Sequence, residues 1–277
     1  MTSMQIKSLI RNMAKEKNIN AQILLRNYML ERLLERISKS KYKENFVLKG
    51  GMLVASMVGI DTRSTIDLDA TLKNFPLTKE KIISAFENVL STDINDNITI
   101  ELLNVMEIRE EADYHGFRLS LLGKVDESRV PLKVDITTGD KITPRAIKYS
   151  FKLLLEDRNI EVLAYNLETV LAEKVESIIS RATENTRMRD FYDIYILTKL
   201  QSQNIDLELF KQALKATAEN RGSAKQLERS NEILNMIGEN LTLEKLWKNY
   251  VAKNSYAKGI QWKTVIESVS KMFNDIN

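Results

Sequence analysis

The stretch from Lys49 to Asp69, KGGMLVASMVGIDTRSTIDLD, constrains most strongly what this chain can fold into. It opens with a glycine pair, continues as an apolar run, and ends with Asp67 and Asp69, one residue apart. These features predict a turn that can approach phosphate, a short helix, and a strand. Residues i and i+2 of a strand point to the same face, so the two aspartates should stand side by side. The opposite face should carry Ile66, Leu68 and Ala70.

These two aspartates are expected to need a positive partner. Carboxylates that share one face repel each other unless a cation lies between them. Mg²⁺ prefers oxygen ligands and is commonly bound together with substrate phosphates. Gly50 and Gly51 fit the same chemistry, because backbone amides at a helix N-terminus favour phosphate. The stretch therefore predicts a site for a nucleotide and Mg²⁺.

The composition limits the remaining possibilities. Hydrophobic residues make up 43% of the chain and charged residues 29%, as in soluble globular proteins. Only 9 glycines and 3 prolines favour a helix-rich fold. The absence of cysteine excludes disulfides, thiolate metal sites and cysteine nucleophiles. No window approaches about eighteen consecutive apolar residues, and the N-terminal residues lack a signal-peptide core, so we expect a cytoplasmic protein without a membrane span.

Hydrophobic periodicity predicts two regions with different secondary structure. In the first region, helices are expected over residues 3–16, 20–38, 52–58 and 79–91. Strands are expected over residues 46–48, 98–108, 117–122 and 130–137, and in the segment that carries the aspartate pair. From about Asn159 onward the period changes to 3.6, with helices expected over residues 167–182, 188–201, 206–219, 223–237, 242–253 and 262–275. This pattern predicts an α+β domain over residues 1–160, including the N-terminal helices, and an all-helical domain over residues 161–277.

Asp135 is a candidate third carboxylate, in the strand segment LKVDIT. Lys133, Asp135 and Thr137 should share one face of that strand. Three aspartates could hold two Mg²⁺ ions, one orienting a triphosphate and one activating a hydroxyl, which Asp135 could also help to deprotonate. The alternative is that Asp135 simply lies on a solvated strand face.

Lys174 interrupts the apolar stripe of the helix NLETVLAEKVESIISR, three residues after Leu171 and four before Ile178. Lysine is rarely buried unless it is paired. One interpretation is a lysine at the edge of the stripe whose ammonium reaches solvent. The other is a cation directed into a cleft, where it would meet a phosphate or a carboxylate.

Asp190 and Asp193 lie three residues apart in the next predicted helix, with Ile194 and Leu197 on the same face. Acidic residues in the first turn of a helix are ordinarily stabilising, which explains Asp190 more fully than Asp193. The alternative is that both carboxylates belong to the same functional site as the lysine.

Five blocks of residues occur in one order between residues 45 and 200. They are Lys49-Gly50-Gly51, Arg63-x-Thr65-x-Asp67-x-Asp69, Lys133-x-Asp135, Lys174, and Arg189-Asp190-x-x-Asp193. As a set they resemble the AbiEii-type nucleotidyltransferase toxins, members of the DNA polymerase β-like nucleotidyltransferase superfamily that share this layout with the MenT toxins. The resemblance implies a polymerase β-like nucleotidyltransferase domain with a mixed, largely antiparallel sheet, followed by the helical domain.

The resemblance also assigns roles by position. It implies that Gly50 and Gly51 contact the triphosphate, that Asp67 and Asp69 ligate Mg²⁺, and that Asp135 takes the third carboxylate position. The remaining nucleotide-binding positions are Lys49, Arg63, Ser64 and Thr65. Lys174 would be the essential lysine near the phosphates, and Asp190 or Asp193 the late aspartate. The chain departs from the common Gly-Ser pattern by carrying Gly50-Gly51, so the serine hydroxyl contact from that turn is absent.

The activity that the resemblance implies is that of a toxin in a bacterial toxin–antitoxin and phage-defence system. Such a toxin would move a nucleotide from an NTP, with GTP favoured, to an RNA acceptor such as tRNA, or to a protein. The expected partner is an AbiEi-type antitoxin encoded nearby, with or without a stable protein complex. Two alternatives are a non-catalytic nucleotide- or partner-binding module and a glycosyltransferase, because Asp-x-Asp also serves nucleotide sugars. The absence of alternating strands and helices before Asp67 argues against the glycosyltransferase.

Overall fold

The structure is a computed structural model that describes residues 1–76, 78–109 and 115–275. The chain forms two compact units, each described separately below. The first, the sheet unit, contains Met1–Gly139 and Ile147–Ala164. The second, the helical unit, contains Asp140–Ala146 and Tyr165–Asn277. Within the described ranges, no helix combines the length and apolar character that crossing a bilayer requires.

The sheet unit is built on one seven-stranded sheet with the order β3-β4-β5-β2-β1-β7-β6. The strands are β1 (Phe46–Lys49), β2 (Leu68–Leu72), β3 (Thr99–Arg109), β4 (His115–Val125), β5 (Ser128–Thr138), β6 (Ile147–Lys152) and β7 (Asn159–Ala164). Only the pairs β2–β5 and β1–β7 are parallel, and the other neighbouring strands run antiparallel. The expected mixed, largely antiparallel sheet is therefore confirmed.

Two strands were missing from the sequence-based expectation. The helical period was expected from about Asn159, but residues 159–164 form β7 and residues 147–152 form β6. In β7, buried Ile160, Val162 and Ala164 alternate with more exposed residues, which is the period of a strand. An alternation of only six residues directly before a long helix is hard to distinguish from the helical pattern that follows it. β7 is stabilised by its parallel pairing with β1, which the local sequence does not report.

The strand boundary at the aspartate pair also differs from the expectation. β2 begins at Leu68, so Asp69 lies in the strand and Asp67 lies in the bend before it. Leu68 and Ala70 are buried as expected, but Ile66 is 43% exposed and does not join them. Strand periodicity therefore applies to Asp69 and fails at Asp67, because the chain has not yet entered the sheet there.

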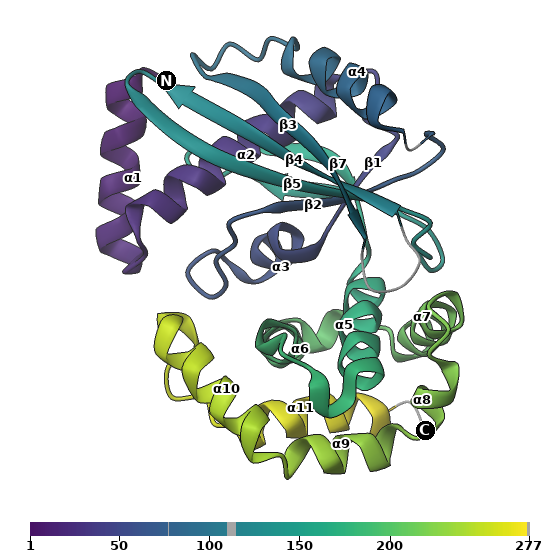
Figure 1. The fold of residues 1–277 in the computed structure, drawn as a ribbon. Coiled ribbons are helices and arrows are strands. Elements are labelled where there is room, and N and C mark those ends of the chain that lie inside the picture. Colours follow the sequence, from purple (N-terminus) through teal and green to yellow (C-terminus); the bar gives the residue numbers. More distant parts are fainter. Residues whose placement is uncertain (77, 110–114, 276–277) are drawn as a thin grey trace. The chain divides into compact units, whose positions relative to one another are not determined.

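Helices cover the apolar face of this sheet. The unit contains α1 (Ser3–Lys17), α2 (Ala21–Lys39), α3 (Gly50–Val58) and α4 (Lys79–Leu90). Asn20 caps α2 and Thr78 caps α4, each through its side-chain oxygen. Helix α2 runs along the sheet (Figure 1), and its Leu34 and Ile37 line a small cavity together with Leu48, Leu68 and Ala70. The apolar face of β1 and β2 is thus the face that packs on α2.

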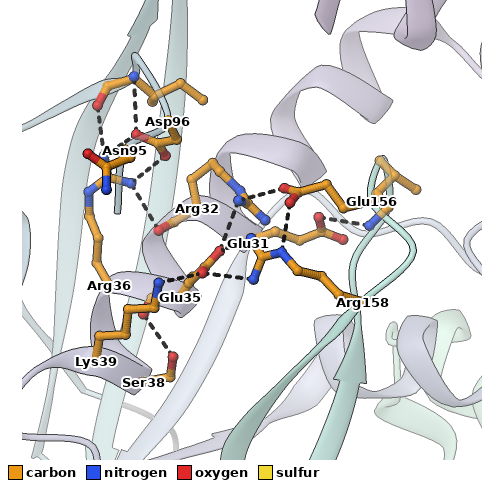
Figure 2. A network of polar contacts seen from close by, with 12 residues as sticks. Glu31, Arg32, Glu35, Arg36, Ser38, Lys39, Asn95, Asp96, Glu156 and Arg158 are labelled. Carbon is orange, nitrogen blue, oxygen red and sulfur yellow. Dashed lines mark hydrogen bonds and ion pairs between the residues drawn. The ribbon is translucent and has the colours of Figure 1, made fainter. Parts of the chain in front are cut away.

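Helix α2 is unusual because four charged residues of its second half are buried: Glu31, Arg32, Glu35 and Arg36. Each finds a partner in a segment that borders the helix (Figure 2). Arg36 donates two hydrogen bonds to Asp96, at 2.9 and 2.8 Å. Arg158 donates two to Glu35, also at 2.9 and 2.8 Å. Buried charges are tolerated in proteins when they are paired in this way. The network connects α2 to the segment at Asp96 and to the segment at Arg158.

The helical unit contains seven α-helices and three short 3₁₀ turns within the described residues. The helices are α5 (Leu167–Arg181), α6 (Met188–Gln201), α7 (Leu207–Asn220), α8 (Ala224–Glu228), α9 (Ser230–Gly238), α10 (Leu241–Lys253) and α11 (Trp262–Asn274). The 3₁₀ turns are Ala182–Glu184, Ser202–Asn204 and Ser255–Ala257. The single helix expected over residues 223–237 is wrong, since the chain leaves helical geometry at Arg229 and forms α8 and α9.

The segment Asp140–Ala146 belongs to the helical unit because it is bound to the start of α5. Asn166 caps α5 with its side-chain oxygen, which accepts from the amide of Thr169 at 3.0 Å. The amide nitrogen of the same side chain donates to the carbonyl of Thr143 at 2.8 Å. Thr169 Oγ1 accepts from the amide of Thr143 at 3.2 Å. One capping residue thus orders both the helix start and the preceding segment.

Candidate functional site

The glycine pair brings the backbone against a carboxylate of the aspartate pair. Helix α3 begins at Gly50 directly after β1, and Gly50 has a φ of +63°, which favours glycine. A Cβ on Gly50 would lie 2.1 Å from Oδ2 of Asp69. The Gly51 amide donates to that same oxygen at 3.2 Å. The close approach of α3 to Asp69 therefore requires glycine at position 50.

Arg63 and Thr65 lie against the other side of this turn. A Cβ on Gly51 would be 2.7 Å from Nη1 of Arg63 and 2.8 Å from Oγ1 of Thr65. Arg63 is 1% exposed, and its Nη1 donates to the carbonyl of Ser64 at 3.0 Å. Arg63 therefore stabilises the backbone at Ser64 through a hydrogen bond from its buried side chain. Its expected contact with a nucleotide stays a prediction.

Asp67 is oriented by Thr65. Oγ1 of Thr65 lies 3.1 Å from Oδ1 of Asp67 and 3.2 Å from its carbonyl oxygen, and it donates to them. Thr65 is completely buried, so its hydroxyl is held in one place. Asp67 lies in a bend, where no strand pairing fixes its backbone. The hydrogen bond from Thr65 therefore restrains the position of its carboxylate.

Asp69 lies in a strongly negative setting. The pKa of Asp69 is raised to about 6, chiefly by burial and then by the negative charge of Asp67, while the charge of Lys49 opposes both. Lys49 is buried and lies level with Asp69 in the neighbouring strand β1. Two carboxylates whose repulsion is incompletely balanced fit a divalent cation, which prefers carboxylate oxygens and would relieve the repulsion. Asp67 and Asp69 are the residues that could hold it.

Asp135 lies where the sheet brings it level with Asp69, through the parallel pairing of β5 with β2. Its carboxylate is nevertheless already paired. Arg118 of β4 donates from Nε to Oδ1 at 2.8 Å and from Nη2 to Oδ2 at 2.7 Å. Lys133 Nζ lies 3.8 Å from Oδ2. Among the described residues, no group of three or more acidic or histidine side chains is arranged to hold a metal ion.

Arg118 is the site residue that sequence reasoning missed. It alternates with buried Phe117 and Leu119, so its face of the strand could be read from the sequence. That it lies level with Asp135 depends on the register between β4 and β5. Register is set by the turn and by packing of the whole sheet, and no local pattern in β4 reports it.

In the helical unit, Lys174 meets two carboxylates. Its Nζ lies 2.9 Å from Oδ1 of Asp190 and 2.6 Å from Oδ2 of Asp193. The lysine side chain is 11% exposed and that of Asp193 is completely buried. Helices α5 and α6 therefore bring together the three residues that the sequence singled out in this region. Lys174 is a paired cation and does not extend into solvent.

A further pair of polar residues extends this group along α5. Ser177 Oγ donates to Oδ2 of Asp190 at 3.4 Å, and Arg181 donates to Ser177 Oγ. Lys174, Ser177 and Arg181 follow one another at helical spacing, three and four residues apart. The sequence contains this spacing, but only Lys174 interrupts the apolar stripe, so Ser177 and Arg181 gave no signal of their own.

Comparison with known proteins places these features in a family. Residues 32–268 match the sequence model of a family described as nucleotidyl transferase AbiEii toxin, type IV toxin–antitoxin system. This match spans most of the chain and includes every candidate residue in both units. No curated protein matches the chain in sequence.

Solved structures support the same fold. MenT4, a nucleotidyltransferase toxin from Mycobacterium tuberculosis, is similar with a TM-score of 0.55 at 13% identity, covering 100% of this chain and 99% of that chain. JHP933 from Helicobacter pylori is similar with a TM-score of 0.51 at 14% identity, covering 93% of this chain and 92% of that chain. At these identities the likeness concerns the fold, which is the expected α+β nucleotidyltransferase architecture with a helical C-terminal region.

Proposed function

This chain belongs to the AbiEii nucleotidyltransferase toxins of type IV toxin–antitoxin systems, and we propose that it transfers a nucleotide from an NTP, with Mg²⁺, to an RNA acceptor. The observation that carries the proposal is the Asp67–Asp69 pair, in which Asp69 lies against the Gly50-Gly51 turn at the start of α3 and Asp67 is held by Thr65. The motif resemblance favours GTP as the nucleotide and tRNA as the acceptor. It also favours an antitoxin of AbiEi type, and a role in phage defence.

Each part of the sheet site has a role in this reaction. In nucleotide transfer, a hydroxyl oxygen of the acceptor bonds to the α-phosphorus and gives its proton to water. The bond from that phosphorus to the bridging oxygen breaks, and pyrophosphate leaves with the electron pair. Asp67 and Asp69 would hold the metal ion, which when bound supplies positive charge to the phosphoryl oxygens. The amides at the start of α3 would bind phosphate oxygens. The Gly51 amide donates to Asp69 Oδ2 at 3.2 Å, which supports the binding of an anionic oxygen by this turn.

The helical unit supplies the second part of the proposal. We propose that Lys174 contacts phosphate oxygens, as the motif resemblance implies, with Asp190 and Asp193 fixing its ammonium. The two ion pairs of 2.9 and 2.6 Å hold the lysine in one position, so less side-chain entropy is lost on binding.

The test is transfer of labelled nucleotide to purified cellular RNA by the full chain with Mg²⁺. Replacing Asp67 or Asp69 by Asn should reduce transfer by about 100-fold or more, because a catalytic metal contributes several kcal/mol of charge stabilisation. Asp126→Asn is the matched control, because Asp126 is a half-exposed residue in the turn between β4 and β5. Full transfer and full toxicity in Asp67→Asn would contradict the proposal and favour a non-catalytic nucleotide-binding module. Omitting each NTP in turn identifies the nucleotide.

A further inference from the structure

Four charged side chains lie level in four neighbouring strands of the sheet. Lys49 of β1 is level with Asp69 of β2, Asp69 is level with Asp135 of β5, and Asp135 is level with Arg118 of β4. Residues that are level in adjacent strands share a face of the sheet. The row therefore reads positive, negative, negative, positive, with the metal candidate Asp69 beside Lys49 and the third aspartate beside Arg118.

The two aspartates of this row differ in how they are balanced. Asp135 accepts hydrogen bonds on both carboxylate oxygens from the planar guanidinium of Arg118, at 2.8 and 2.7 Å. This two-point pairing is the strongest geometry available to a carboxylate and a side-chain cation. The Asp135 side chain is 15% exposed, so its carboxylate is largely shielded from water. Asp69 accepts a hydrogen bond from the Gly51 amide at 3.2 Å.

We infer that Arg118 takes the place of a second metal ion beside Asp135, so that this chain holds one divalent cation, at Asp67 and Asp69. The inference rests on the proposed function and states how many metal ions that site uses. A carboxylate that pairs with a guanidinium through both oxygens already has its negative charge balanced, which makes it a poorer ligand for a second cation. The guanidinium keeps its charge at every relevant pH, so it balances Asp135 permanently.

This arrangement gives Arg118 a positioning role. Asp135 pairs with Arg118 on one side and lies level with Asp69 of β2 on the other. Arg118 also adds a permanent positive charge to this row of side chains. The Arg118 side chain is 37% exposed, so part of the guanidinium faces solvent and an anionic substrate. A guanidinium carries five N–H donors, of which the pairing with Asp135 uses two. The guanidinium of Arg118 then supplies the positive charge that a second metal ion would otherwise bring.

The number of bound metal ions tests this inference independently of activity. Mn²⁺ bound per full-length chain is counted from the loss of the free-ion signal in electron paramagnetic resonance, without added nucleotide, because a triphosphate binds Mn²⁺ itself and would remove the same signal. The wild-type chain should bind one ion, and Asp67→Asn should bind none tightly. Arg118→Met should bind a second ion, since Asp135 loses the guanidinium on both of its oxygens and keeps only the more distant Lys133, at 3.8 Å. The double variant Arg118→Met/Asp135→Asn should return to one.

Arg118→Lys is the matched control, because it keeps a positive charge beside Asp135 and should leave the count at one. Two ions on the wild-type chain, or one ion on an Arg118→Met chain whose circular dichroism is unchanged, would overturn the inference. Failure of the proposed function would give a different combination of metal count and transfer activity. A chain that binds one Mn²⁺ and gains a second in Arg118→Met, but transfers no nucleotide, would contradict the transferase reaction and retain the assignment of Arg118.

Discussion

Lys174 Nζ lies 2.6 Å from Oδ2 of Asp193, a carboxylate that is completely buried between helices of one unit. The same ammonium lies 2.9 Å from Asp190, which is partly exposed. A lysine in an apolar stripe is stabilised only by such partners, because an unpaired charge in this position would lose its hydration without compensation. The buried partner should therefore contribute more to the stability of α5 and α6 than the exposed one.

Replacing Asp193 by Asn should lower the free energy of unfolding of the helical unit by about 2 kcal/mol, because Lys174 then loses its buried anionic partner and keeps the more exposed one. Asp190→Asn should cost about 1 kcal/mol or less, because Asp190 is more exposed and solvent replaces part of the interaction. Hydrogen exchange of peptides from α5 and α6 in increasing urea measures both. Equal effects, or a larger effect of Asp190→Asn, would show that burial does not decide between the two pairs.

Gly50→Ala should abolish the arrangement of Asp69, since the new Cβ would lie 2.1 Å from its Oδ2 and the residue has positive φ. We expect transfer activity to fall by about 100-fold or more because the metal-binding pair is displaced. Gly222→Ala separates backbone strain from this clash, as Gly222 has a φ of +70° and a Cβ added there would meet no atom within 4 Å. Gly222→Ala should lose about 1 kcal/mol of stability through backbone strain alone. Gly50→Ala should lose more because of the added clash, and it alone should lose activity. Activity retained in Gly50→Ala would contradict the role of the turn.

Thr65→Val tests whether the hydrogen bond to Asp67 orients that carboxylate. Valine matches threonine in shape at this fully buried position but removes the hydroxyl 3.1 Å from Oδ1 of Asp67. Nucleotide transfer should fall about 10- to 100-fold, the effect expected for losing one hydrogen bond to a charged group. Thr65→Ser should restore most of it. The prediction fails if Thr65→Val and Thr65→Ser give the same rate.

Glu31 should make the sheet unit less stable as the pH rises. Burial raises the pKa of Glu31 to about 8, although the amide of Leu154 donates to it and Arg32 lies nearby. The folded state therefore keeps a proton that the unfolded chain loses near pH 4.5. Stability from this group is complete below about pH 4.5 and lost as the pH rises through about 8. Glu31→Gln should match wild type at low pH and exceed it at pH 9, measured as the thermal midpoint.

Glu35 provides the opposite control in the same network (Figure 2). Burial alone would raise the pKa of Glu35, but hydrogen bonds from Arg158 and Lys39 bring it down to about 2. Its contribution is present above about pH 4.5 and is lost as the pH falls through about 2. Glu35→Gln should therefore destabilise the unit at pH 7 and at pH 9. A pH dependence of stability that is the same in Glu31→Gln and in wild type would contradict a protonated Glu31.

Several elements could be read directly from the sequence. Helices α1, α2, α4 and α6 were predicted with boundaries within one residue of those observed, since long apolar stripes and the caps Asn20 and Thr78 are local signals. The candidate residues Asp67, Asp69, Lys174, Asp190 and Asp193 were singled out by spacing alone. β6 and β7 were missed, since a short strand is stabilised by its neighbours in the sheet and its own periodicity is weak.

Local sequence patterns were sufficient to predict the α+β class, the helical second region, and the charged residues that interrupt an apolar pattern. Each of these depends on neighbours within a few residues of one another along the chain. Which residues meet depends on the tertiary structure: Arg118 pairs with Asp135, Lys174 pairs with Asp193, and Gly50 lies against Asp69. These partners are brought together by strand register and helix packing, which depend on the burial of the whole core, and no local segment of sequence specifies them.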